Sequence, residues 1–162
     1  MSTLIRDKTI QADDYAKLAD DAPLPTSGKI IVTLERWQKE EATLRSGALS
    51  VGVSLPNTAD VVALWPNLKD RPLIELQFPS FGDGRAYSQA RVLHDRFGYK
   101  GEIRATGAAV VRDQIHNMHR SGITSFALRA DQDPQVCLTA FKDFSQAYQP
   151  GADDRRIVRA LR

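Results

Sequence analysis

The chain has 162 residues, of which 42% are hydrophobic and 26% charged, with a formal net charge of +2. These values predict one globular domain over residues 1–162, exclude a wholly disordered chain, and give no compositional reason to expect binding to nucleic acid or a membrane. The single cysteine excludes an internal disulfide and a four-thiolate metal site, and no run resembles a signal peptide or a membrane span, so we expect a cytoplasmic protein.

The first part of the chain, residues 1–28, reads as an N-terminal arm. It is rich in aspartate and closes with Pro23, Pro25 and Gly28. A short helix is expected around 13–18. The β-rich run 29–34 then predicts a strand, and the charged run 35–45 predicts a short helix.

From residue 48 the sequence alternates between strand-like and helix-like segments. Such alternation is typical of parallel βα units, and we count four of them in a core over 48–149, followed by a basic tail over 150–162. The predicted strands are 49–55, 73–78, 101–106 and 124–128. The predicted helices are 58–64, 85–97, 110–120 and 134–148. We expect the tail to form a short amphipathic helix.

Local signals mark the helix ends. Pro66 should end or kink the second helix, whereas Gly98 and Gly122 suit left-handed stops. Asp133 before Pro134 is a predicted N-cap. The last helix carries an apolar stripe that we assign to the core, which makes its cysteine a buried structural thiol. That stripe consists of Cys137, Phe141, Phe144 and Tyr148.

The strands alternate apolar residues with small or polar ones. Because side chains on a strand point to opposite faces in turn, each strand should have one apolar and one polar face. All helices then belong on the apolar face, and right-handed crossovers give sequential strand order. The predicted fold is a parallel, half-barrel-like α/β sheet, with an open doubly wound sheet as the alternative.

The polar face of this sheet should carry several charges. The residues expected there are Glu75, Gln77, Glu102, Arg104 and Arg129. Burying a charged side chain without water or an ion-pair partner costs too much desolvation free energy. A solvated pocket, a network of internal ion pairs, or a cover made by the arm or by a second subunit would satisfy them, and we favour pairing or covering over a catalytic pocket.

The richest loop is FPSFGDGR over 78–85. Gly82 and Gly84 permit unusual backbone angles, Asp83 can cap the next helix, and Arg85 stands in its first turn. A glycine loop before a helix suits an anion, and an arginine can add a two-pronged contact. The alternative is a capped turn in which Arg85 pairs with Asp83 or Glu75.

A second loop follows the strand 101–106. Thr106 lies where a βα-barrel enzyme holds substrate, and Asp113 and Gln114 follow on the next helix. Asp113, His116 and His119 have a spacing that metal sites use, but the buried stripe of their helix turns His116 to solvent, so we predict no metal site. The candidate ligand or docking residues are Glu75, Asp83, Gly84, Arg85, Arg104, Thr106, Asp113, Gln114 and Arg129.

Several segments resemble a known family. They are FPSFGDGRAYS over 78–88, FGYKGEIRATG over 97–107, RDQ over 112–114, RSG over 120–122 and YQ over 148–149. The chain resembles a bacterial family of unknown function that is typically encoded beside the sulfite reductase haemoprotein. Members of that family are often described as oxidoreductases of sulfite reduction. Ser121 stands where many members carry a cysteine, which weakens any thiol mechanism at that position.

The resemblance implies a role in assimilatory sulfate reduction with the sulfite reductase haemoprotein as partner. Since no haem, flavin, nicotinamide or iron–sulfur motif is visible, we expect no cofactor and an accessory or interaction protein. The alternative is a small-molecule site or enzyme on the polar face that takes an oxyanion through Arg85, Arg104 and Arg129. A homodimer is compatible with a half-barrel that has a charged face.

Overall fold

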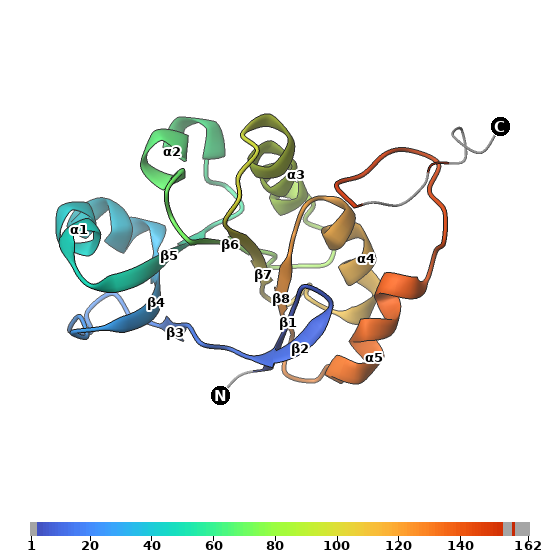
Figure 1. Cartoon of the computed structure of the whole chain (residues 1–162), viewed down its shortest axis with the longest axis horizontal. Helices are drawn as coiled ribbons and strands as arrows, with labels where there is room; N and C mark the ends of the chain where they lie inside the picture. Colours follow the sequence, from blue (N-terminus) through green and yellow to red (C-terminus); the bar gives the residue numbers. More distant parts are fainter. Residues whose placement is uncertain (1–2, 154–156, 158–162) are drawn as a thin grey trace.

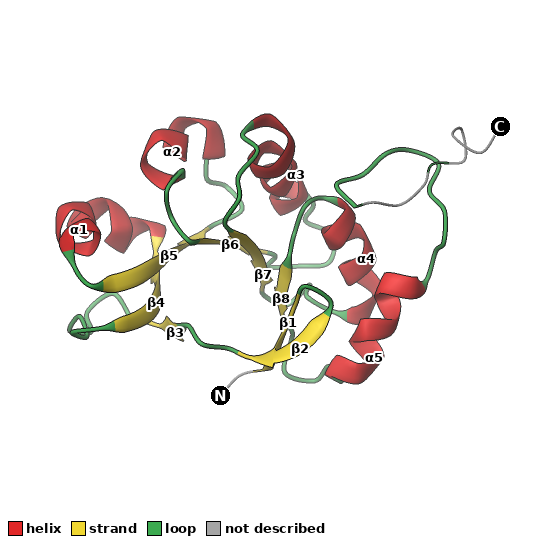
Figure 2. Cartoon of the chain, in the orientation of Figure 1, coloured by secondary structure: helices red, strands yellow, loops and turns green. Residues whose placement is uncertain are grey.

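The computed structural model describes residues 3–153 and 157. In this part of the chain one eight-stranded sheet is accompanied by five α-helices (Figures 1 and 2). The strands are β1 (Thr3–Arg6), β2 (Thr9–Ala12), β3 (Ala16–Lys17), β4 (Gly28–Thr33), β5 (Leu49–Leu55), β6 (Leu73–Gln77), β7 (Glu102–Thr106) and β8 (Ser125–Ala127). The helices are α1 (Leu34–Ser46), α2 (Val61–Leu68), α3 (Arg85–Arg91), α4 (Arg112–Arg120) and α5 (Pro134–Leu138). A π-helical segment, η1 (Val92–Arg96), continues α3, and a 3-10 turn, η2 (Thr139–Lys142), continues α5.

The sheet is mixed, and the expectation of a purely parallel sheet is wrong at one edge. Its strand order is β2-β1-β8-β7-β6-β5-β4-β3. All neighbours from β3 to β8 are parallel, whereas β1 pairs antiparallel with both β8 and β2. The antiparallel pair is a hairpin of the N-terminal arm, turned by Asp7 and Lys8 at φ 51° and 61°.

The curl of the sheet confirms the half-barrel and excludes the doubly wound alternative. Figure 1 shows the labelled helices on the convex side of the sheet, while the concave inner side faces the N-terminal arm. The arm supplies β1 and β2 to one edge and β3 to the other, so residues 13–15 link the two edges. The helix expected around 13–18 is therefore wrong, because β3 extends the sheet there by pairing with β4.

Strand register explains the alternation seen in the sequence. One row across five strands is apolar, points outward to the helices, and is at most 1% exposed: Leu55, Leu76, Ala105, Phe126 and Ile5. A second row is polar and points inward. Its residues lie one position earlier on β5 to β8 and one position later on β1: Ser54, Glu75, Arg104, Ser125 and Arg6. The outer row builds the core, and the inner row builds the site.

The half-barrel contains one more βα unit than predicted. Strand β4 pairs parallel with β5 along six residue pairs from Gly28↔Leu49 to Thr33↔Ser54, and α1 follows it directly. The Thr33 side chain caps α1 by accepting a hydrogen bond from the Arg36 amide at 3.1 Å. The strand and helix expected at 29–34 and 35–45 thus form the first of five units.

Two predicted helix ends differ from the structure. Helix α2 does not end at Pro66 but runs to Leu68, and the Lys69 amide bonds the Trp65 carbonyl at 3.0 Å. The last helix is shorter than 134–148, because α5 ends at Leu138 and η2 ends at Lys142. Phe144 and Tyr148 are 59% and 85% exposed, so their assignment to the core is wrong.

Other local signals are confirmed. Asp133 caps α5 by accepting from the Gln135 amide at 2.8 Å. Gly98 and Gly122 have φ of 58° and 102°. Cys137 is 1% exposed, and burial raises the pKa of its thiol, as expected for a structural cysteine.

The structure describes only part of the basic tail. Residues 154–156 and 158–162, which carry the predicted amphipathic helix, lie outside the described residues. Ile157 forms a bridge with Ala147. Across residues 3–153, none of the helices has the length and apolar character that crossing a membrane demands.

We predict that Gly107→Ala destabilises the fold. Gly107 has φ 116°, and an added Cβ would lie 2.5 Å from the Phe78 carbonyl oxygen. Left-handed strain and overpacking against backbone should together lower the free energy of unfolding by about 2–4 kcal/mol in urea denaturation. Gly82→Ala is the matched control, since nothing lies within 4 Å of its added Cβ. Equal effects of the two substitutions would contradict the prediction.

Candidate functional site

The inner face of the sheet is a paired polar surface covered by the arm, so both the ion pairs and the cover considered from the sequence are present. Asp13, Tyr15 and Lys17, at alternate positions of the arm, each contact a different inner-face side chain. Their partners are Arg104 on β7, Ser50 on β5 and Glu75 on β6. The arm therefore covers this surface on the side where a complete barrel would have its remaining strands.

Arg104 is the deepest cation of the inner face. It is 0% exposed, and its Nη1 donates to both carboxylate oxygens of Asp13 at 2.9 and 3.0 Å. Its Nε donates to Glu102 Oε1 at 2.9 Å. Its Nη2 lies at the same distance from that oxygen but is not aligned for a hydrogen bond. Arg104 also lies over the Tyr15 ring, 5.4 Å from the centroid. Two carboxylates and an aromatic ring thus replace water around this guanidinium.

A second group of ion pairs anchors the start of the arm. Arg6 lies 3.0 Å from Glu102 Oε2 and 3.0 Å from Asp14 Oδ1, and Lys29 lies 2.5 Å from Asp14 Oδ2. The hydrogen bond from Lys29 lowers the pKa of Asp14 to about 2, against some opposing desolvation, with further help from Arg6. Asp14 is therefore ionised throughout the physiological range.

The later part of the arm is held from the other side. Arg36 on α1 is 5% exposed and donates to the carbonyls of Ala19 and Ala22, the latter at 2.7 Å. Thr33 donates to Asp20 at 2.7 Å. The arm is tied down at both ends across the open side of the half-barrel.

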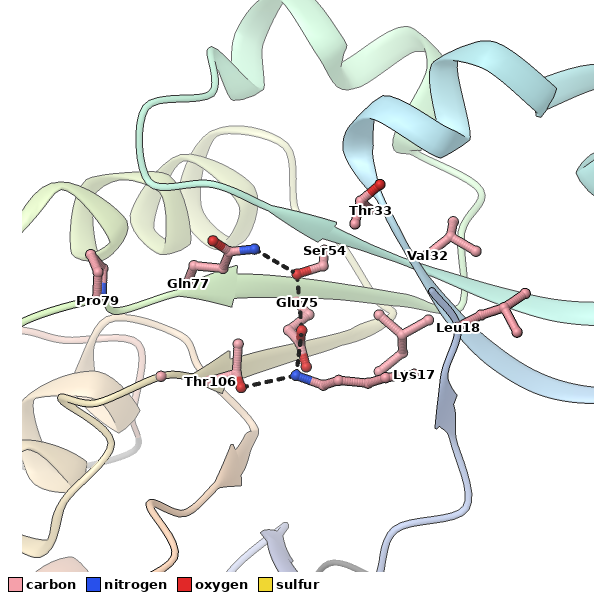
Figure 3. A pocket seen from close by; sticks show the side chains of 11 residues that line it. Lys17, Leu18, Val32, Thr33, Ser54, Glu75, Gln77, Pro79 and Thr106 are labelled. Atoms are coloured by element: carbon pink, nitrogen blue, oxygen red, sulfur yellow. Dashed lines mark hydrogen bonds and ion pairs between the residues drawn. The ribbon is translucent and has the colours of Figure 1, made fainter. Parts of the chain in front are cut away.

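Glu75 is the buried carboxylate of the inner face. It is 1% exposed, accepts from Ser54 Oγ at 2.9 Å through Oε1, and pairs through the same oxygen with Lys17 Nζ at 3.0 Å (Figure 3). Gln77 donates to Ser54 at 3.2 Å and extends the chain of hydrogen bonds. The second oxygen, Oε2, is buried and has no hydrogen-bond partner among the described residues.

These groups line a cavity of about 330 Å³ at the carboxyl ends of β4 to β7. In βα folds this end of the sheet is where ligands bind. The polar lining comes from Lys17, Thr33, Ser54, Glu75, Gln77 and Thr106, and the apolar lining includes Leu18, Ile31 and Pro79. The volume lies at the lower end of the usual range for small-molecule sites.

Two of the nine candidate ligand or docking residues line this cavity, and so does Gln77, which was expected on the polar face. Glu75 and Thr106 do so, and Arg104 is buried nearby on the same face, in register with Glu75. Thr106 accepts a hydrogen bond from Lys17 at 3.1 Å. The glycine after it has the left-handed backbone that lets the loop approach Phe78 closely.

The loop 81–85 forms the alternative weighed from sequence, a capped turn. Asp83 accepts from the Arg85 amide at 3.2 Å and pairs with the Arg85 guanidinium at 2.6 Å. Asn57 donates to the same carboxylate at 2.7 Å. These hydrogen bonds, led by that of Arg85, hold the pKa of Asp83 well below its usual range. Gly84 has φ −87°, so it does not use the left-handed backbone that glycine permits.

The remaining candidates lie apart from the cavity lining. Arg129 pairs with Asp131 at 2.6 Å and donates to the Ala108 carbonyl. Asp113 is 76% exposed beside Arg112, and Gln114 accepts from the Tyr87 hydroxyl. The three arginines proposed for an oxyanion each already face a carboxylate.

Sequence reasoning missed the arm residues of the site. Asp13, Tyr15 and Lys17 have the period of two that marks an extended segment facing a sheet. The acidic composition of the arm obscured that period. The charges expected on the inner face also required counter-charges from elsewhere in the chain, which the same residues supply.

The fold and the cavity define an α/β half-barrel domain whose charged inner face is neutralised by its own N-terminal arm. The chain belongs to a family described as bacterial protein of unknown function (DUF934), which matches residues 52–158. That match spans β6, β7 and β8 of the polar face, whereas the arm precedes it. Comparison with curated proteins gives no match.

We predict that Asp13→Ala loosens the arm. Removing one partner of a buried ion pair leaves Arg104 undercompensated, so the free energy of unfolding should fall by about 2–4 kcal/mol. Trypsin cleavage after Lys17 should also become faster. Asp131→Ala is the control, because its pair with Arg129 is exposed and should contribute nothing measurable. Equal losses of stability in the two variants would show that the Asp13–Arg104 pair contributes no more than an exposed ion pair.

Proposed function

We propose that the chain is a small-molecule-binding domain whose ligand occupies the cavity at the carboxyl ends of β4 to β7. Glu75 carries this proposal, because a carboxylate that is 1% exposed retains one oxygen without a protein hydrogen-bond partner. An unpartnered buried acceptor is costly, and a group from a ligand would satisfy it. Thr106, Ser54 and Gln77 supply the polar contacts that orient such a ligand.

The charges of this cavity favour binding of a polar small molecule over binding of an oxyanion. Arg85, Arg104 and Arg129 are each paired with a carboxylate, at 2.6 to 2.9 Å. The charges that line the cavity are Lys17 and Glu75, which neutralise one another. Glu75 is the group positioned to exchange a proton with a bound molecule if the domain also catalyses a reaction.

The test is a ligand-observed NMR screen with small cationic, neutral and anionic polar compounds, sulfite and sulfate among them. We expect hits that Gln77→Trp abolishes by filling the cavity. Gln149→Trp should preserve them, because Gln149 is exposed and lies outside the lining. A screen without hits, or hits that survive Gln77→Trp, would reject the site.

We propose, second, that this domain serves sulfite reduction as a partner of the sulfite reductase haemoprotein. The proposal is supported by the sequence resemblance of residues 78–88 and 97–107. It is also supported by exposed apolar side chains on and after α5, which offer contact area for a protein. Val136, Phe144 and Tyr148 are 51%, 59% and 85% exposed.

This second proposal predicts a growth phenotype. Deletion of the gene should create a requirement for reduced sulfur that sulfide meets and sulfite does not. The protein should co-purify with the haemoprotein at low salt, and Tyr148→Ala with Phe144→Ala should weaken that complex about tenfold or more. Normal growth of the deletion strain on sulfate, together with no complex, would reject it.

A further inference from the structure

We propose that the ligand of the cavity carries a primary ammonium group on a short aliphatic chain, and that Lys17 occupies the place of that group in the structure. This inference rests on the proposed binding function and names its ligand class. It follows from how the sheet holds Lys17, from the charge of Glu75, and from the exposure of the Lys17 side chain.

The sheet forms a built site for an ammonium group. Lys17 Nζ lies 3.0 Å from Glu75 Oε1 and 3.1 Å from Thr106 Oγ1, so two neighbouring strands each supply one acceptor (Figure 3). Ser54 Oγ donates to the same Glu75 oxygen at 2.9 Å and fixes the carboxylate. An ammonium has three donors. The carboxylate oxygen that lacks a partner is a further acceptor within the same group.

The charge of Glu75 restricts what can take the place of Lys17. A carboxylate that is 1% exposed is strongly destabilised when no cation lies beside it. A ligand that displaces Lys17 must therefore bring a positive charge of its own. An anion in the cavity would instead add a like charge beside Glu75 and is disfavoured.

Lys17 is held loosely enough to be displaced. Its side chain is 57% exposed, so water can solvate the ammonium group when a second cation takes its place beside Glu75. Strand β3 has only two residues and pairs with β4 at Ala16↔Ile30 and Lys17↔Ile31. An exposed lysine thus covers a buried carboxylate.

The rest of the lining matches an aliphatic chain. Leu18, Ile31, Val32 and Pro79 surround the cavity beside the Lys17 side chain. The lysine side chain is itself a primary ammonium on a four-carbon stem. A small alkylammonium compound such as n-butylammonium therefore reproduces the group that the site already accommodates.

The experiment is chemical rescue of Lys17→Ala by n-butylammonium chloride, followed by thermal unfolding. At a concentration tenfold above its Kd, the probe should raise the melting temperature of Lys17→Ala by about 3–6 °C. The wild-type chain should bind it at least tenfold more weakly, because Lys17 competes. Tetramethylammonium, which has charge but no N–H donor, and sulfite should give no comparable shift.

The double variant Lys17→Ala, Glu75→Gln is the matched control. Without the carboxylate the demand for a cation disappears, so n-butylammonium should have no effect. Equal stabilisation of the single and double variants, no stabilisation of the single variant, or rescue by sulfite would overturn the inference. If Lys17→Ala does not fold alone, NMR titration of the wild type replaces it. Shifts at the Glu75 and Thr106 amides then support the inference, and their absence overturns it.

The two proposals can fail separately. If compounds other than ammonium ions bind in the NMR screen and Gln77→Trp abolishes their binding, the binding domain stands and the ammonium assignment falls. If no compound of any charge binds, the binding domain itself is rejected.

Discussion

Glu75 and Arg104 lie opposite one another on β6 and β7, are 1% and 0% exposed, and each forms an ion pair with the N-terminal arm. Burying such charges is tolerable only when counter-charges are supplied in good geometry. A half-barrel has no second half to supply them. The arm does so with Lys17 and Asp13, so the position of the first part of the chain follows from the charge on the sheet.

The same balance extends along the whole inner face. Its cations Arg6, Lys17, Lys29 and Arg104 match its anions Asp13, Asp14, Glu75 and Glu102 in number, four against four. These eight groups therefore contribute nothing to the net charge of +2. Among the described residues of this face, Glu75 Oε2, Arg104 Nη2 and Arg6 Nε lack hydrogen-bond partners. Glu75 differs from the two arginines because its ion-pair partner is an exposed lysine.

The sequence predicts the repeating core well because strand alternation and helix stripes are local signals. Val53, Ile74 and Ile103 alternate with polar neighbours, and that pattern alone places the helices on one face. The edges of the sheet were not predictable in this way. β3 has two residues, and β1 becomes a strand through its pairing with β8 far along the chain. Two arginines considered for an anion site, Arg85 and Arg129, instead pair with carboxylates two residues away. That local pairing was weighed from the sequence for Arg85 but not for Arg129.

The pairing of β1 with β8 also sets an order for folding. Leu4 lies beside Ala127, whereas β4 to β7 pair with near neighbours in sequence. Contacts between distant parts of a chain form late because the intervening loop must first be closed. During synthesis β1 leaves the ribosome before β8, so this part of the arm can dock only after β8 has emerged. We therefore expect the nascent half-barrel to pass through a stage in which its charged inner face is exposed to water and the strands β1 and β2 are still unfolded.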